Sequence, residues 1–194
     1  MSTKCGIAAA ALLLVSACAR PSAAPRTGQT PDQQAATVHN AQDVVFARHM
    51  IPHHQQALDM ADMVPTHTAN ATLHTVAIHI KTDQQAEIVT LNGYLTRWGE
   101  PLHDPSETMG MGGSMPMEGM VDAATMAKLP SLTGTDFDTL WITSMISHHQ
   151  GAVTMAQDEI AHGQNPDAIK SADIIVASQE REISYMRDLL ATSR

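Results

Sequence analysis

The chain has 194 residues, enough for one domain with a real core, and a formal net charge of −9. No run of Lys or Arg occurs, which argues against nucleic acid and against an anionic membrane surface as the main partner. Hydrophobic residues make up 43% and aromatic residues only 3%, so the core must consist of Ala, Leu, Ile, Val and Met, a composition that suits helices.

The first 18 residues resemble a bacterial lipoprotein signal peptide. An apolar segment at 7–15 is too short to span a bilayer, and residues 15–18 read Val-Ser-Ala-Cys. We expect cleavage before Cys18 and lipidation of its thiol, which would anchor an exported protein to the outer face of the cytoplasmic membrane or elsewhere in the cell envelope. Ordinary secretion is the alternative. Residues 19–35, rich in Ala, Pro, Ser, Thr and Gln, predict a flexible tether.

One motif occurs twice, which predicts an internal repeat. The pattern Met-Ile-x-His-His-Gln-x-Ala-x-x-Met-Ala begins at Met50 and again at Met145, an offset of 95 residues. The offset continues downstream, where Ile80, Gln84, Glu87, Ile88, Leu91 and Leu95 pair with Ile175, Gln179, Glu182, Ile183, Met186 and Leu190. Two copies of one helical hairpin explain this most simply.

The first hairpin is expected over residues 36–98. Apolar residues at spacings of three and four predict a helix over about 36–64, with a kink at Pro52 and an end at Val64-Pro65. A second helix is predicted over about 70–98, with Asn70 as its N-cap and Gly99 at its end.

A Met-rich linker over 99–121 and a second hairpin over 122–194 follow. The linker holds five Met within twelve residues among Gly and Pro, a composition that excludes a regular element. Residues 123–129 predict one or two helical turns. Helices are then expected over about 135–161 and from Pro166 onward. These elements predict an all-α fold, a four-helix bundle of two hairpins related by a pseudo-twofold axis, with residues 36–194 as one domain.

Polar residues on the buried helix faces predict one polar layer. Six side chains should meet there, namely His53, His148, Gln84, Gln179, Glu87 and Glu182. The layer must be internally hydrogen-bonded, hydrated or metal-bound, because a buried polar group without a partner costs about 1–3 kcal/mol. His54 and His149 are rotated by about 100° from the inner pair, so we expect them nearer the edge, as ligands in a groove or as solvated side chains.

Methionines accompany the histidines on the same helix faces. The shared faces hold Met50, His53 and Met60 in the first repeat and Met145, His148 and Met155 in the second. Thioether with imidazole favours copper, above all Cu(I), whereas ordinary core packing is the alternative. His49 and His53 form an i, i+4 pair suited to Cu(II) or Zn(II), which the second repeat lacks because Ser144 replaces His49.

The linker methionines suggest a second, flexible set of soft ligands. They are Met109, Met111, Met115, Met117 and Met120. Because they lie in a Gly-rich segment, core packing does not account for them. A low-complexity loop without metal is the alternative.

The repeated motifs resemble the signature of the bacterial family known as domain of unknown function 305. The resemblance covers about residues 38–192 and includes the Gln-x-x-Glu-Ile segments at 84–88 and 179–183. It implies a ferritin-like bundle, export, and copper binding by some members through Met and His. Carried over, it implicates Met50, His53, His54, Met60, Met145, His148, His149 and Met155. The repeats differ at Asp59 and Asp62, where the second has Thr154 and Gln157, so the halves need not bind alike.

The sequence leaves three functions open. The first is an extracytoplasmic copper-binding lipoprotein that buffers or sequesters copper, with a metal ion as its partner and only a lipid anchor in the membrane. The second is a structural or interaction module at the cell surface, whose polar layer fixes helix register. The third is a ferritin-like metal oxidase, although the repeated motifs offer His-His-Gln and Gln-x-x-Glu instead of the Glu-x-x-His that this chemistry uses.

Overall fold

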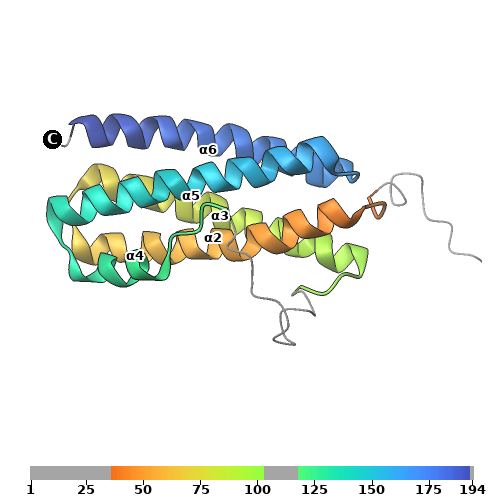
Figure 1. The fold of residues 1–194 in the computed structure, drawn as a ribbon, viewed down its shortest axis with the longest axis horizontal. Coiled ribbons are helices and arrows are strands. Elements are labelled where there is room, and N and C mark those ends of the chain that lie inside the picture. The colour runs from red at the N-terminus through yellow and green to blue at the C-terminus, as the bar shows by residue number, and fades with distance from the viewer. Residues whose placement is uncertain (1–35, 103–117, 193–194) are drawn as a thin grey trace, which may run out of the picture.

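The computed structural model describes residues 36–102 and 118–192, and all regular structure within these ranges is helical. Its elements are α2 (Ala41–His67), α3 (Ala71–Trp98), α4 (Ala123–Lys128), the 3₁₀ turn η2 (Leu129–Ser131), α5 (Gly134–His162) and α6 (Pro166–Thr192). The four long helices lie side by side as a bundle (Figure 1). The expectation of an all-α, ferritin-like four-helix bundle is confirmed.

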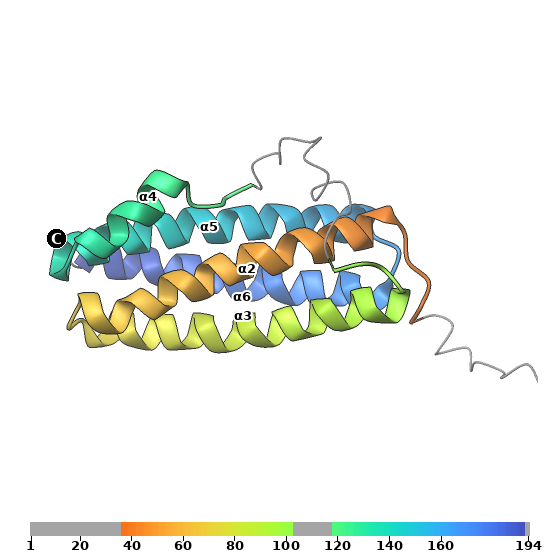
Figure 2. The same ribbon diagram turned by 90° about the horizontal axis from the view of Figure 1, so that it is seen from below.

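The bundle consists of two antiparallel hairpins that meet through their first helices. α2 packs along α3, α5 packs along α6, and the main contact between hairpins joins α2 to α5. α4 and η2 lie on the outside of the four-helix bundle, beside α2 and α5 (Figure 2). The offset of 95 residues equates α2 with α5 and α3 with α6, so the repeat in the sequence is a repeat in the fold.

Matched aspartates join the two hairpins at opposite ends of the bundle. Asp43 of α2 accepts a hydrogen bond of 2.8 Å from the backbone N–H of Asn165, whose own side chain caps α6. Asp138 of α5, the equivalent residue, accepts one of 2.9 Å from the side chain of Asn70, which caps α3. Both aspartates are buried. An Asp–Asn contact therefore fixes each hairpin against the helix cap of the other, through the Asn165 backbone at one end and the Asn70 side chain at the other.

Most helix ends agree with the sequence, and α2 is the exception. α3 begins after the Asn70 cap and ends at Gly99, which has a left-handed φ of 75°. α2 begins at Ala41, after the Asn40 cap, and not near residue 36 as predicted. It continues through Pro52 and Pro65 to His67, so the predicted end at Val64-Pro65 is also wrong. Both prolines are on the exposed side of α2, so their rings do not enter the core.

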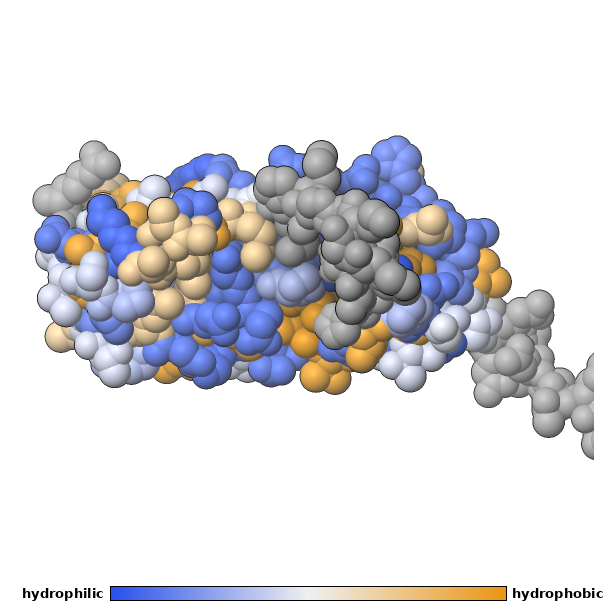
Figure 3. Space-filling view, turned by 60° about the horizontal axis from the view of Figure 1, so that its bottom comes forward, coloured by the Kyte–Doolittle hydropathy of each residue, from blue (hydrophilic) through white to orange (hydrophobic). Residues whose placement is uncertain are grey.

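Two hydrophobic clusters fill the bundle on either side of its middle. The cluster near the start of α2 includes Phe46, Met50, Leu91, Leu95 and Ile175, and the other includes Met60, Leu73, Phe137, Trp141 and Met186. The Trp141 indole donates a hydrogen bond of 2.8 Å to the backbone oxygen of Met60. The face of the molecule in Figure 3 mixes hydrophilic side chains with apolar areas. Within the described ranges, no helix is both long and apolar enough to span a membrane.

Candidate metal centre

Four histidines from α2 and α5 meet between the two hydrophobic clusters. His53, His54, His148 and His149 all have an exposed fraction of 0%. The rings of His53 and His148 lie 3.7 Å apart between centroids, and Nε2 of His148 lies 3.0 Å from the backbone oxygen of His53. The inner pair that the repeat predicts is therefore a direct contact between the two hairpins.

The second histidine of each motif is buried, contrary to the expectation that it lies near the edge. Nε2 of His54 is 2.7 Å from Oε2 of Glu87, and Nε2 of His149 is 2.6 Å from Oε2 of Glu182. The carboxylates come from α3 and α6, and their side chains are 19% and 21% exposed. Each first helix packs against two neighbours, so a rotation of 100° leads to a second buried face. The glutamates, rather than the histidines, face the solvent.

Several polar atoms of the layer lack protein partners. The side-chain amides of Gln84 and Gln179, each 2% exposed, make no hydrogen bond in the described structure. Both ring nitrogens of His53 and the Nδ1 atoms of His54, His148 and His149 also lack a partner with hydrogen-bond geometry within residues 36–102 and 118–192. Because each buried orphan group costs about 1–3 kcal/mol, internal hydrogen bonds alone do not account for this layer.

Burial keeps the inner histidines neutral. Burial, followed by the neighbouring His54 and His149, lowers the pKa of His53 from 6.5 to about 3. The pKa of His148 is also well below its usual value, first through burial and then through His53. Neutral imidazoles keep a lone pair available, so protons would not compete with a metal ion for these nitrogens near neutral pH.

The motif methionines flank the histidine layer on both sides. Met50 belongs to one hydrophobic cluster, with Met155 packed against it, and Met60 and Met145 belong to the other. The antiparallel packing of α2 and α5 thus pairs the first methionine of each motif with the second methionine of the other. Thioethers and imidazoles are a donor set that suits a soft ion such as Cu(I).

The remaining predicted ligands are not gathered at this layer. His49 is exposed whereas His53 is fully buried, so these two do not form the surface chelate that their spacing suggests. Met120 is half-buried next to the described end of the linker. The other linker methionines, Met109, Met111, Met115 and Met117, and the lipidation residue Cys18 lie outside the described residues.

The described end of the linker packs on α2 and α5. Gln56 and Gly151, which the sequence analysis does not single out, make these contacts. The Gln56 amide accepts from Val121 N at 2.8 Å and donates to Val121 O at 2.9 Å. A Cβ on Gly151 would overlap the backbone oxygen of Glu118 and lie 2.5 Å from Gly119 Cα. The Glu118 backbone is also close enough to His53 to act on its pKa. Gln56 and Gly151 occupy the same repeat position, a difference that was the available signal.

The histidine layer is not a ready-made cluster of conventional ligands. Within 36–102 and 118–192, no three His, Cys, Asp or Glu side chains are placed to hold one metal ion. The two glutamates are already engaged by the outer histidines. The donors that fit a metal here are therefore the unpartnered imidazole nitrogens, with thioether sulfur on either side.

The family model described as a domain of unknown function (DUF305) matches residues 43–190, which include both motifs and all four long helices. The chain belongs to the DUF305 family. No curated protein matches it. The resemblance seen in the repeated motifs is confirmed over nearly the range expected.

Solved DUF305 structures share the fold. One from Streptomyces coelicolor, assigned as a secreted protein, is 34% identical, with 78% of this chain and 93% of that chain covered and a TM-score of 0.71. One from Deinococcus radiodurans is 31% identical, with 79% and 97% covered and a TM-score of 0.69. CopM in its Cu(II)-bound form is 32% identical, with 78% and 97% covered and a TM-score of 0.67. CopM has also been solved in Cu(I)-bound and Ag-bound forms.

Proposed function

We propose that this DUF305 protein binds copper outside the cytoplasm and buffers or sequesters it, with Cu(I) preferred over Cu(II) or Zn(II). One observation carries the proposal. A buried layer of four imidazoles has ring nitrogens without a hydrogen-bond partner among the described residues and lies between methionine side chains on both sides. The ligands with which we propose to hold the ion are His53, His54, His148 and His149 with Met50, Met60, Met145 and Met155.

The chemistry of these groups supports a soft ion. Thioether and imidazole ligands select Cu(I), and the low pKa of His53, about 3, keeps the ring neutral, with one nitrogen lone pair free to bind a metal. The similarity to CopM, a protein solved with Cu(I), Cu(II) and Ag, points the same way. We also propose that the linker methionines form a second soft site, with Met120 held near the bundle through its neighbour Val121.

The test is an anaerobic Cu(I) titration of the mature chain against a competing chelator. We expect His53→Ala and His148→Ala to weaken binding by at least about tenfold, since even loss of a partner that supports a ligand costs about that factor. His49→Ala is the matched control, because that residue is on the same helix but exposed. Cu(I) affinity that is unchanged in both buried variants would exclude the layer as the site.

A second set of variants separates the bundle from the linker. One variant replaces all five linker methionines by Leu, namely Met109, Met111, Met115, Met117 and Met120. If the bundle holds Cu(I), tight binding survives in this variant and stoichiometry falls. Loss of all tight binding in this variant would assign copper to the linker and leave the histidine layer as a structural element.

A structural role for the layer is the main alternative, and two contacts favour it. His148 donates to the backbone oxygen of His53, and each outer histidine contacts a glutamate. This alternative expects no effect of metal on stability. Copper at about 100 times its dissociation constant should instead stabilise the folded state by about 2.7 kcal/mol if it binds only that state. Chelator removal of the metal, followed by urea unfolding, distinguishes the two.

We further propose that the protein is exported and anchored by a lipid on Cys18. The lipoprotein-like sequence before this residue supports the proposal, as does the relative that is assigned as secreted. A Cys18→Ala variant should move from the membrane fraction to the soluble fraction of the cell envelope. Retention of the variant on the membrane would contradict lipid anchoring at this residue.

A further inference from the structure

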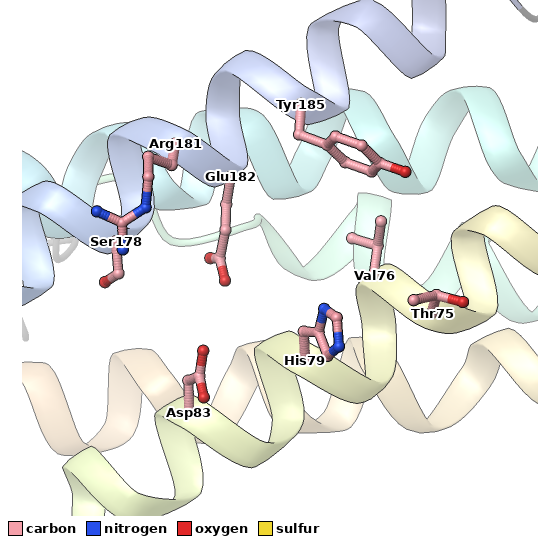
Figure 4. A pocket seen from close by; sticks show the side chains of 8 residues that line it. All are labelled: Thr75, Val76, His79, Asp83, Ser178, Arg181, Glu182 and Tyr185. Carbon is pink, nitrogen blue, oxygen red and sulfur yellow. The ribbon is translucent and has the colours of Figure 1, made fainter.

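A groove of about 490 Å³ lies between α3 and α6, away from the α2 and α5 surface on which the described end of the linker packs (Figure 4). It is lined by Thr75, Val76, His79, Asp83, Ser178, Arg181, Glu182 and Tyr185. Glu182 is the carboxylate that hydrogen bonds to the fully buried His149. The groove therefore leads from solvent to one end of the histidine layer.

Two further ligand-type side chains reach into this groove without a partner. His79 and Asp83 are exposed, one helical turn apart on α3, and neither makes a hydrogen bond or ion pair with any residue that the structure describes. Figure 4 shows the His79 ring and the Asp83 carboxylate extending from α3 toward the same space as Glu182 of α6. Arg181 extends along α6 toward Ser178 and away from His79 in the same view.

The pseudo-twofold axis supplies an internal comparison. The equivalent groove, about 150 Å³, is also between α3 and α6 and contains Glu87, the mate of Glu182. At the positions equivalent to His79 and Asp83, the second repeat has Ile174 and Ser178. Glu87 is the single charged side chain among the described residues that line this smaller groove. His79 and Asp83 are therefore not required by the bundle, since the other half has Ile and Ser at the equivalent positions.

We propose that the α3–α6 groove is a second metal site, which takes a divalent cation such as Zn(II) or Cu(II) through His79, Asp83 and Glu182. Imidazole and carboxylate are the donors that these cations accept, whereas Cu(I) prefers the sulfur-rich interior. An i, i+4 pair on a helix points both ligands the same way, and Glu182 approaches from the facing helix. No three of the described groups are already placed around one point, so binding requires rotation of the exposed side chains on α3.

The site shares Glu182 with the histidine layer. A cation that engages Glu182 competes with His149 for the same carboxylate, 2.6 Å away. Occupation of the groove should therefore change the environment of a buried histidine, although none of the four layer histidines lines the groove. Coupling between two sites is reciprocal, so soft-metal binding in the layer should in turn change the affinity of the groove.

Isothermal titration of the mature protein with Zn(II), in the absence of copper, tests the proposal. We expect a single Zn(II) per chain, and affinity reduced by at least about tenfold in His79→Ile and in Asp83→Ser. Both changes install the residue that the other repeat uses, so folding should be unaffected. His49→Ile is the control, because His49 is exposed but does not line the groove. In histidine NMR spectra, Zn(II) should shift His79 and His149 together.

Three results would overturn the proposal. The first is no Zn(II) binding to the unchanged protein. The second is Zn(II) affinity in both groove variants equal to that of the unchanged protein. The third is a loss of affinity in His49→Ile as large as in His79→Ile. The Cu(I) titration of the same variants keeps this proposal separate from the proposed function. Retained Cu(I) binding with lost Zn(II) binding supports two sites, and lost Cu(I) binding in the groove variants would contradict the separation.

Discussion

Replacing Glu159 by Gln should remove a loss of stability that we expect between pH 6.5 and 8. Glu159 of α5 is fully buried beside Asp43 of α2. Burial alone would raise the pKa of Asp43, but hydrogen bonds from the backbone N–H groups of Asn40, Asn165 and Gln164 outweigh it and lower that pKa. Asp43 is therefore a buried anion. Burial first, and then the Asp43 carboxylate, raises the pKa of Glu159 from 4.5 to about 8.

The size of the effect follows from the difference between folded and unfolded pKa values. Between pH 4.5 and 8 the folded state keeps a proton on Glu159 that the unfolded state has lost. The free energy of unfolding therefore falls as pH rises, by about 1.4 kcal/mol per pH unit. Buried His53 and His148 act in the opposite direction, because their folded pKa values are lowered, and at pH 6.5 their unfolded-state imidazoles are still half protonated. The two histidines therefore regain about 0.8 kcal/mol from pH 6.5 to 8. From pH 6.5 to 8, Glu159 alone should cost about 2 kcal/mol.

Urea unfolding followed by circular dichroism at pH 6.5, 7.2 and 8 measures this slope. The unchanged protein should lose about 1 kcal/mol over the interval, because the histidines offset part of the Glu159 loss. Glu159→Gln, which keeps the shape and an N–H donor toward Asp43, should lose none and gain the histidine contribution of about 0.8 kcal/mol. Glu180→Gln on the exposed face of α6 controls for the change of net charge and should keep the slope. The same slope in Glu159→Gln as in the unchanged protein would refute the assignment of this loss to the proton on Glu159.

Two further predictions concern contacts between segments that are distant in sequence. Gly151→Ala should destabilise the fold by about 1–3 kcal/mol or displace Glu118, because the new Cβ overlaps its backbone oxygen, and faster amide exchange near the linker end would report displacement. Unchanged stability together with unchanged exchange would contradict the close contact. Asp138→Ala should cost about 1–2 kcal/mol by leaving the Asn70 amide unpaired, and Asp43→Ala should cost more because Asp43 accepts several backbone N–H groups. Equal losses on urea unfolding would contradict that ranking.

The helices could be predicted because each carries its own signals. Polar caps at Asn70 and Asn165 and apolar residues at spacings of three and four specify where the helices of each hairpin begin and which face they bury. The repeat at an offset of 95 residues then specifies that the two hairpins are alike. The predicted end of α2 is wrong because proline often ends a helix, whereas Pro65 lies on the exposed side of α2 and the helix continues to His67.

The candidate centre was predictable only in part, because its outer half depends on tertiary contacts. The burial of His53 and His148 follows from the apolar stripe of a single helix. The burial of His54 and His149 depends on where a second neighbour lies, which the spacing along one helix does not specify. Gly151 is a similar case, because its lack of a Cβ matters only where the Glu118 backbone packs against it.

Differences between the two repeats separate what the fold needs from what function adds. Residues that match across the axis, such as His53 with His148, are consistent with a shared centre that either half could support. Residues that differ mark additions to one half, since the other half shows that the scaffold stands without them. Gln56 and Gly151 seat the linker from the same repeat position with opposite means, one by side-chain hydrogen bonds and one by the absence of a side chain. His79, opposite Ile174 in the repeat, gives the α3–α6 groove its imidazole by the same kind of divergence. A copper site at the axis would therefore be symmetric in its histidines, whereas its link to the linker and its neighbouring groove would belong to one side only.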